Sequence, residues 1–233
     1  MTEVADGDPN SPAAGARRPI KARSSRWASA LANELVRRNV KPNTISMASV
    51  AFAAVGALGL VLTRAEVPPW LAGLLYLLAI VGIQGRLICN LLDGMVAVEG
   101  GKGGPTGEVF NDLPDRLADP ILLAAAGYGI GITTGVELGW LAAIGAILTA
   151  YVRVLGRSIG AGTYFLGPMA KQHRMALLTA ACVVAAVVAW FHDSARRWVM
   201  YGALLLIVVG CVFTILRRLG FIFRDMRAKG AKL

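Results

Sequence analysis

Six carboxylates crowd into one short stretch of an otherwise strongly apolar chain. The stretch runs from Ile88 to Asp119 and holds six of the fourteen acidic residues, namely Asp93, Glu99, Glu108, Asp112, Asp115 and Asp119. Apolar runs flank it on both sides, and carboxylates at or near membrane depth are costly enough to mark functional sites. A bound cation is the simplest way to hold several carboxylates together, because their oxygens are the ligands that Mg²⁺, Mn²⁺ and Ca²⁺ prefer.

Composition places the rest of the chain in a bilayer. Hydrophobic residues make up 56% of the 233 residues and charged residues only 16%, below the roughly 25% of a typical soluble domain. The apolar residues fall in repeated runs of about twenty, the length that spans a bilayer core, and the number of such runs excludes a soluble all-α protein. We therefore expect an all-α integral membrane protein with six transmembrane helices. They are expected at residues 44–62, 69–98, 107–132, 136–159, 171–191 and 197–223.

The ends of the chain differ from its middle. The first residues are rich in Ala, Gly, Pro, Asp and Ser and lack apolar periodicity, which is typical of a disordered tail. Trp27, Leu31 and Leu35 then repeat at four-residue spacing among basic residues, which predicts an amphipathic helix on the membrane surface. A topogenic charge cluster is the plainer interpretation of that segment, and both can hold. The expected divisions are a disordered tail at 1–19, an amphipathic juxtamembrane helix at 20–40, a six-helix membrane domain at 41–223 and a basic cytoplasmic tail at 224–233.

The distribution of the net charge of +10 indicates an orientation. Lys and Arg collect on one side of the expected helices, whereas the other side holds only Arg64, Arg196 and Arg197. By the positive-inside rule, both termini and the acidic stretch face the cytoplasm, in an inner or plasma membrane. Because the basic residues flank apolar runs instead of covering a soluble surface, we expect membrane lipids and no nucleic acid as partners.

Two pairs of polar residues within the acidic stretch have helical spacing. Asn90 and Asp93 are three residues apart, and Asn111 and Asp115 are four apart, so each pair shares one face of a helix. Two such helices bring four oxygen-bearing side chains to one point. The glycine-rich residues 100–107 between them carry little side-chain bulk, so a nucleotide phosphate can approach their backbone closely.

This pattern resembles the signature of the CDP-alcohol phosphotransferases, which reads D-x-x-D-G-x-x-A-R-x8-G-x-x-x-D-x-x-x-D. Five positions match it in residue type and spacing: Asp93, Gly94, Ala97, Gly107 and Asp115. Three positions depart from it, with Asn90 and Asn111 where the signature has Asp, and Val98 where it has Arg. The match runs without a gap from Asn90 to Asp115, which makes it specific.

The resemblance implies a reaction and a metal. An acceptor hydroxyl would attack the β-phosphorus of a CDP-alcohol such as CDP-diacylglycerol and expel CMP, in a step of phospholipid synthesis. Asp115 stands at the position of the general base. The positions that ligate Mg²⁺ or Mn²⁺ are held by Asn90, Asp93, Asn111 and Asp115. The two Asn residues remove two negative charges, and Asp112 and Asp119 are nearby candidates to restore them.

The resemblance also implies two substrate sites. Contacts to the nucleotide are expected from Asn43, Asp93, Gly94, Ala97, Gly107 and Asp112. In the family, cationic residues from the fourth helix and the segment that follows it line the pocket for a small phosphorylated or polyol acceptor, and here these are Arg153, Lys171 and Arg174. Positive-inside bias alone would also place cations there.

A homodimer is the expected assembly. Family members are commonly homodimers, and Gly127, Gly131 and Gly135 would permit close approach of two helices. Two other functions remain open, a catalytically degenerate protein that binds a nucleotide lipid and a cation-coupled transporter. A transporter typically places polar residues near the midplane of several helices, often in internal repeats, whereas here they gather at one end of the helices.

Overall fold

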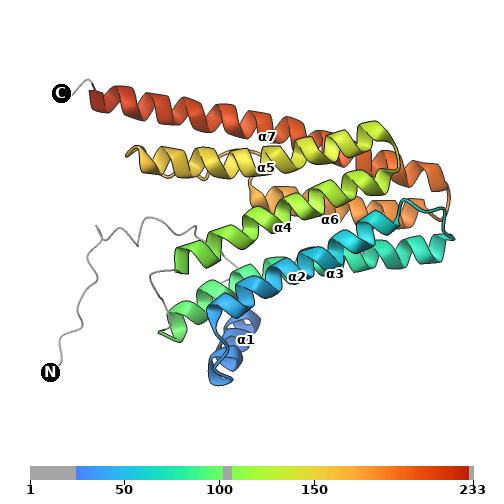
Figure 1. Cartoon of the computed structure of the whole chain (residues 1–233), viewed down its shortest axis with the longest axis horizontal. Coiled ribbons are helices and arrows are strands. Elements are labelled where there is room, and N and C mark those ends of the chain that lie inside the picture. Colours follow the sequence, from blue (N-terminus) through green and yellow to red (C-terminus); the bar gives the residue numbers. More distant parts are fainter. Residues whose placement is uncertain (1–24, 102–106, 231–233) are drawn as a thin grey trace.

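The chain folds into a bundle of long helices (Figure 1). The computed structural model describes residues 25–101 and 107–230, and within them all regular structure is helical. The helices are α1 (Arg26–Arg37), α2 (Pro42–Leu62), α3 (Pro69–Glu99), α4 (Gly107–Ile130), α5 (Thr133–Ser158), α6 (Lys171–Val188) and α7 (Asp193–Gly230). The expected all-α class is confirmed. The tail expected at 1–19 lies outside the described residues.

Helices α2 to α7 coincide closely with the six expected helices, and proline sets the start of two of them. Pro42 and Pro69 stand in the first turns of α2 and α3, where the missing N–H costs no hydrogen bond. The expected end of the last helix at Phe223 is wrong, because α7 continues to Gly230. Its final turns carry Arg227 and Lys229, and cations at a helix C-terminus are favoured by the helix dipole.

Five helices are long and apolar enough to cross a membrane, which supports a multi-pass membrane protein. They are Pro42–Leu62, Pro69–Glu99, Thr133–Ser158, Lys171–Val188 and Ser194–Gly230. Helix α4 is not among these five. Its N-terminal half concentrates charge, with Asp112, Asp115, Arg116 and Asp119 within eight residues.

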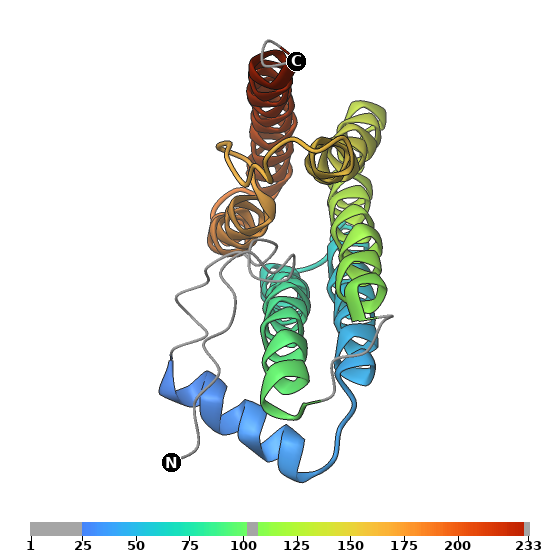
Figure 2. The same ribbon diagram turned by 90° about the vertical axis from the view of Figure 1, so that its left-hand side faces the viewer.

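The six long helices pack in a ring. Going around it, α3 contacts α2, α2 contacts α4, α4 contacts α5, α5 contacts α7, α7 contacts α6, and α6 returns to α3. Figure 2 shows this order from one end of the bundle. Elements far apart in sequence therefore meet, and in particular the N-terminal turns of α4 and α6 reach the last turns of α3.

Helix α1 lies across the end of this ring, against α3 (Figure 2). Ala28 and Ala32 are fully buried in a cluster with Leu92 and Val96 of α3. Trp27, on another part of the surface of α1, is 51% exposed. The amphipathic helix is thus present from Arg26 to Arg37, residues 20–24 of the expected segment lie outside the described residues, and its place on a membrane surface stays a prediction.

The glycines expected to form a dimer face are used within the chain. A Cβ on Gly127 would lie 2.6 Å from the Gly135 carbonyl oxygen and 2.8 Å from the Gly139 Cα. These residues close the contact between α4 and α5, and Gly131 makes the turn between those helices with φ at 81°. The expectation that Gly127 and Gly135 face a second copy is therefore wrong, and the homodimer stays a prediction without that support.

Candidate active site

Asp115 lies where α3, α4 and α6 meet. Its Oδ1 accepts hydrogen bonds from Asn90 Nδ2 and from Arg86 at 3.2 Å, while its Oδ2 accepts one from Lys171 Nζ. Its side chain is only 12% exposed. The structure thus brings the expected general base together with one expected metal ligand, Asn90, and one expected acceptor contact, Lys171.

Asp119 lies one helical turn further along α4, and it is paired on both oxygens. Arg86 forms an ion pair with its Oδ1, and Arg174 donates to its Oδ2 at 2.9 Å. Arg174 also donates to Thr149 Oγ1 at 3.0 Å and to the Met169 carbonyl oxygen at 2.8 Å. Arg174 is thus buried in support of Asp119, and this carboxylate is not free to replace the charges missing at Asn90 and Asn111.

Asp93 occupies a different environment. Its Oδ2 accepts a hydrogen bond from Ser46 Oγ of α2 at 2.7 Å. Its Oδ1 and the Oδ1 of Asn90 are buried and have no hydrogen-bond partner among the described residues. Buried polar atoms are normally paired, so two unpartnered acceptor oxygens three residues apart on α3 fit the ligation of a hard cation.

The unpartnered oxygens of Asn90 and Asp93 fit the ligation of one cation better than that of two. No group of three or more His, Cys, Asp or Glu able to hold a metal occurs among the described residues. The carboxylates beside Asp93 are neutralised by side chains, since Arg86, Lys171 and Arg174 pair with Asp115 and Asp119. The side chain of Asn111, a further expected ligand, lies outside what the structure describes.

Asp112 lies at the partly exposed rim of the site. It pairs with Arg116 at 2.8 Å and with Arg153 at 3.4 Å. The Arg153 guanidinium also lies 5.3 Å from the centroid of the Phe165 ring. Asp112 is therefore matched by cations, like Asp119, and does not restore negative charge at the Asn positions.

The remaining expected contacts line the ends of α2, α3 and α4. Asn43 lies in the first turn of α2, and Gly94 and Ala97 lie in the last turns of α3. Gly107 begins α4, and a Cβ built on it would meet no atom within 4 Å. Residues 102–106 of the glycine-rich loop lie outside the described residues.

Arg86 and Ser46 are site residues to which the sequence pattern assigns no role. Arg86 is fully buried and contacts the carboxylates of Asp115 and Asp119. The sequence does contain a feature that marks Arg86, because this residue is a lone cation in an apolar run and precedes Asn90 by four residues. Ser46 carries no comparable signal, since its partner Asp93 is 47 residues away.

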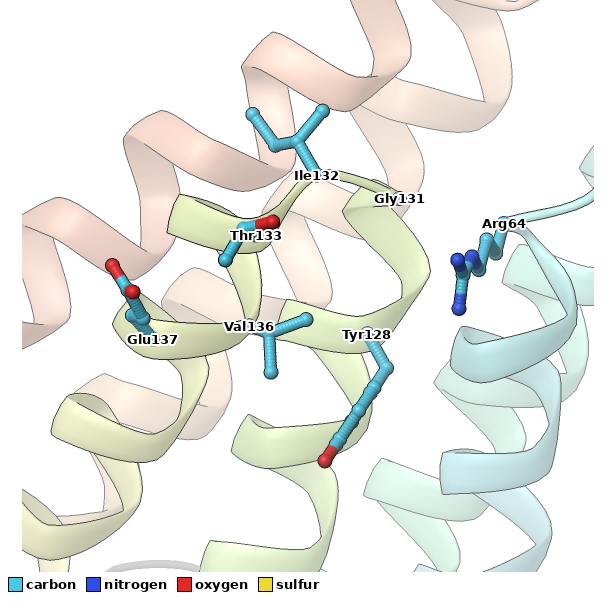
Figure 3. A pocket seen from close by; sticks show the side chains of 7 residues that line it. All are labelled: Arg64, Tyr128, Gly131, Ile132, Thr133, Val136 and Glu137. Atoms are coloured by element: carbon cyan, nitrogen blue, oxygen red, sulfur yellow. The ribbon is translucent and has the colours of Figure 1, made fainter.

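A separate pocket of about 430 Å³ opens at the opposite end of the bundle. It lies where the turn after α2 meets the turn between α4 and α5, and Figure 3 shows Arg64 facing Tyr128 across it. Its lining consists of Arg64, Tyr128, Gly131, Ile132, Thr133, Val136 and Glu137. It contains none of the expected catalytic, nucleotide, metal or acceptor residues, so the carboxylate centre stays the candidate site.

Comparison with known proteins identifies the fold. No family model matches the sequence, and no curated protein matches it. Among solved structures, phosphatidylinositol phosphate synthase of Mycobacterium tuberculosis with CDP-DAG bound superposes with a TM-score of 0.67 at 19% identity, over 85% of this chain and 94% of that chain. The same enzyme with manganese and citrate gives 0.67 at 18% identity, over 84% and 88% of the two chains. Its apo form gives 0.64 at 19% identity, over 83% and 95%.

The buried ion pairs generate a prediction about stability. We expect Arg174→Met to lower the free energy of unfolding by about 3–5 kcal/mol, because it leaves the Asp119 carboxylate buried with one cation fewer. Adding Asp119→Asn should recover much of that loss, because the cation and the anion are then removed together. Thermal unfolding of the purified protein in mild detergent measures both effects.

The control variant is Arg116→Met, which removes a cation from the partly exposed pair with Asp112. Such pairs contribute about 0–1 kcal/mol, so this variant should unfold close to the parent. A double variant that is no more stable than Arg174→Met alone would contradict the charge pairing of Asp119 and Arg174.

Proposed function

We propose that this protein is a metal-dependent CDP-alcohol phosphotransferase of phospholipid synthesis. It would move a phosphatidyl group from CDP-diacylglycerol to an acceptor hydroxyl and release CMP. One observation carries the proposal: the two unpartnered buried oxygens, on Asn90 and Asp93, lie beside Asp115 at the spacing of the family signature. The fold supports it, because an enzyme of the same fold has been solved with CDP-DAG and with manganese.

Asn90 and Asp93 are the residues that would hold the cation, joined by Asn111 and Asp115 at the other signature positions. When bound, Mg²⁺ or Mn²⁺ supplies neutralisation of the pyrophosphate and of the departing CMP. Ser46 holds Asp93 through Oδ2 and so directs the other oxygen of that carboxylate to the cation. An amide oxygen at Asn90 can ligate a hard cation but brings no charge of its own.

The nucleotide would lie over the ends of α2, α3 and α4. Small residues support this placement, because Gly94, Ala97 and Gly107 leave room for the cytidine and its phosphates beside the helices. Asn43 contributes a polar side chain from the start of α2, and Asp112 contributes one from the rim.

Lys171 connects the acceptor to the base. Both oxygens of Asp115 are engaged, and Lys171 holds Oδ2. A phosphate on the acceptor would attract the Lys171 ammonium and the Arg153 guanidinium by charge-assisted hydrogen bonds. Oδ2 of Asp115 would then be free to accept the proton of the attacking hydroxyl. This arrangement favours a phosphorylated alcohol over an uncharged polyol as acceptor.

The orientation follows from the same residues. We propose that α4 also crosses the membrane, in addition to the five apolar helices, which makes six crossings in all. Its charged half would be neutralised inside the bundle by Arg86, Lys171 and Arg174. The excess of Lys and Arg at the end that carries the site supports a cytoplasmic location for both termini and for the site.

The function is tested by CMP release. Purified protein with CDP-diacylglycerol and a panel of alcohols and phosphorylated alcohols should release CMP and form a new phospholipid, read by mass spectrometry. Phosphorylated acceptors should be preferred, and excess chelator should abolish turnover until Mg²⁺ or Mn²⁺ is restored. Metal-dependent binding of CDP-diacylglycerol without CMP release would instead indicate a degenerate binder. If the protein neither binds CDP-diacylglycerol nor releases CMP, a cation-coupled transporter is the remaining alternative.

Two carboxylate variants separate the base from the metal ligand. Asp115→Asn should lower turnover by about 10²–10⁴-fold, the usual contribution of a positioned base, while binding of CDP-diacylglycerol largely survives. Asp93→Asn should weaken binding of metal and of CDP-diacylglycerol together, because it removes the negative charge of a carboxylate that would ligate the cation. Turnover and metal-dependent binding are measured for each variant that keeps the parent's unfolding temperature. Parental turnover in Asp115→Asn would show that another residue is the base.

Reporter fusions test the orientation. Fusions at Ala65, Gly103, Gly135, Gly167, Ser194 and the C-terminus should alternate between outside and inside, beginning outside at Ala65. An outside signal at Gly103 would rule out a cytoplasmic site.

A further inference from the structure

A non-helical segment, residues 159–170, connects α5 to α6 and lies along the last turns of α7; we refer to it as the strap. Figure 2 shows it passing from α5 across α7 to α6. Five of the contacts between the strap and α7 follow one another in order. They are Met169 N–H to Thr214 Oγ1 (2.9 Å), Arg218 Nε to the Leu166 carbonyl (2.9 Å), the Tyr164 ring on the Phe221 ring (5.4 Å between centroids), Gly162 N–H to Asp225 Oδ2 (2.7 Å) and Lys229 Nζ to the Gly160 carbonyl.

These five contacts run antiparallel along the two segments, and we refer to them together as the ladder. Along α7 the contacting residues follow one another every three or four positions, from Thr214 to Lys229, so they share one face of the helix. Along the strap the contacts run in the opposite direction, from Met169 back to Gly160. Ile222 of α7 is buried in a cluster with Ala161 of the strap and Val152 of α5. The final turns of α7 therefore support the strap along its whole length.

The end of the strap nearest the site is seated closely on α7. Gly167 has φ at 128°, and a Cβ on it would lie 2.4 Å from Thr214 Cγ2. A Cβ on Gly210 would lie 2.6 Å from Met169 Cε. Glycine at both positions permits this approach, so the position of Met169 is fixed from two sides.

Met169 in turn connects α7 to the carboxylates. Its carbonyl oxygen accepts a hydrogen bond from Arg174, which pairs with Asp119. Two residues after Met169, α6 begins at Lys171, whose ammonium pairs with Asp115. The ladder on α7 thus ends at the residue that precedes both cations of α6.

We propose that the C-terminal turns of α7 position Lys171 for the acceptor through the strap, with Thr214 and Asp225 as positioning residues at its two ends. This assignment rests on the proposed function. The ladder touches none of the expected nucleotide contacts, since these lie on α2, α3 and α4. Loosening the strap therefore weakens binding of a phosphorylated acceptor and leaves binding of CDP-diacylglycerol intact.

The kinetic test compares matched variants at the two ends of the strap. Thr214→Val removes the hydroxyl that accepts the Met169 N–H while keeping the shape of the side chain, and Thr214→Ser restores the acceptor oxygen. Asp225→Ala removes the acceptor of the Gly162 N–H, and Asp225→Asn keeps an oxygen there. We expect Thr214→Val and Asp225→Ala to raise the acceptor KM about five- to tenfold, the scale of one lost hydrogen bond.

The KM for CDP-diacylglycerol and the kcat should stay within about twofold of the parent in those two variants, and Thr214→Ser and Asp225→Asn should keep parental constants. Arg224→Ala is the control, an exposed residue of the same turn of α7 that makes none of the five contacts. An unchanged acceptor KM, or an equal change in both KM values, overturns the proposal.

A second measurement does not depend on the reaction. Lys171 is labelled in the full-length protein with an amine-reactive acetylating reagent, and the extent is read by peptide mass spectrometry. Thr214→Val and Asp225→Ala should increase labelling of Lys171 several-fold, while Thr214→Ser, Asp225→Asn and Arg224→Ala should not. If the parent releases no CMP, the proposed function fails and the labelling alone decides on the strap. Parental labelling in both Thr214→Val and Asp225→Ala overturns the positioning role.

Discussion

Compensation of buried charge is the constraint on which this bundle depends. Asp115 and Asp119 of α4 lie inside a helical bundle, where an unpaired carboxylate is prohibitively costly. Their partners come from two other helices, Arg86 from α3 and Lys171 and Arg174 from α6. These five side chains neutralise one another, so their ion pairs hold the three helices together at the same end of the ring. The end of the bundle that carries the candidate site is therefore also the end that these buried ion pairs hold together.

The same pairing explains why Asn rather than Asp at position 90 suits this chain. Asn90 donates its amide hydrogen to Asp115 and keeps its oxygen unpartnered beside the free oxygen of Asp93. A carboxylate at position 90 would have no hydrogen to donate, and two carboxylates in contact need a proton or a cation between them. Lys171 and Arg86 already supply cations to Asp115. The departure from the family signature is thus consistent with a site whose charges are balanced largely by side chains.

The local features of this fold were readable from the sequence, and the long-range ones were not. Apolar runs and Pro42 and Pro69 located the long helices, and helical spacing placed Asn90, Asp93 and Asp115 on facing surfaces. Ser46 and the strap could not be predicted, because their partners lie roughly fifty or more residues away and irregular backbone has no periodicity. The dimer expectation at Gly127 failed for a related reason: a row of glycines indicates close packing but does not say against which helix.

The length of α7 extends its last turns beyond the bilayer core. A helix of 38 residues is about 57 Å long at 1.5 Å per residue, against a hydrocarbon core of about 30 Å, so its last turns extend well beyond the bilayer core. The strap lies beside those turns and, after the residues that cap α5, its backbone is not helical. Backbone N–H and C=O groups that a non-helical segment withdraws from water need hydrogen-bond partners in the protein. Thr214, Arg218, Asp225 and Lys229 supply those partners. Because the strap is held in this way and leads directly into Lys171 and Arg174, we expect changes in the last turns of α7 to reach the carboxylates of α4.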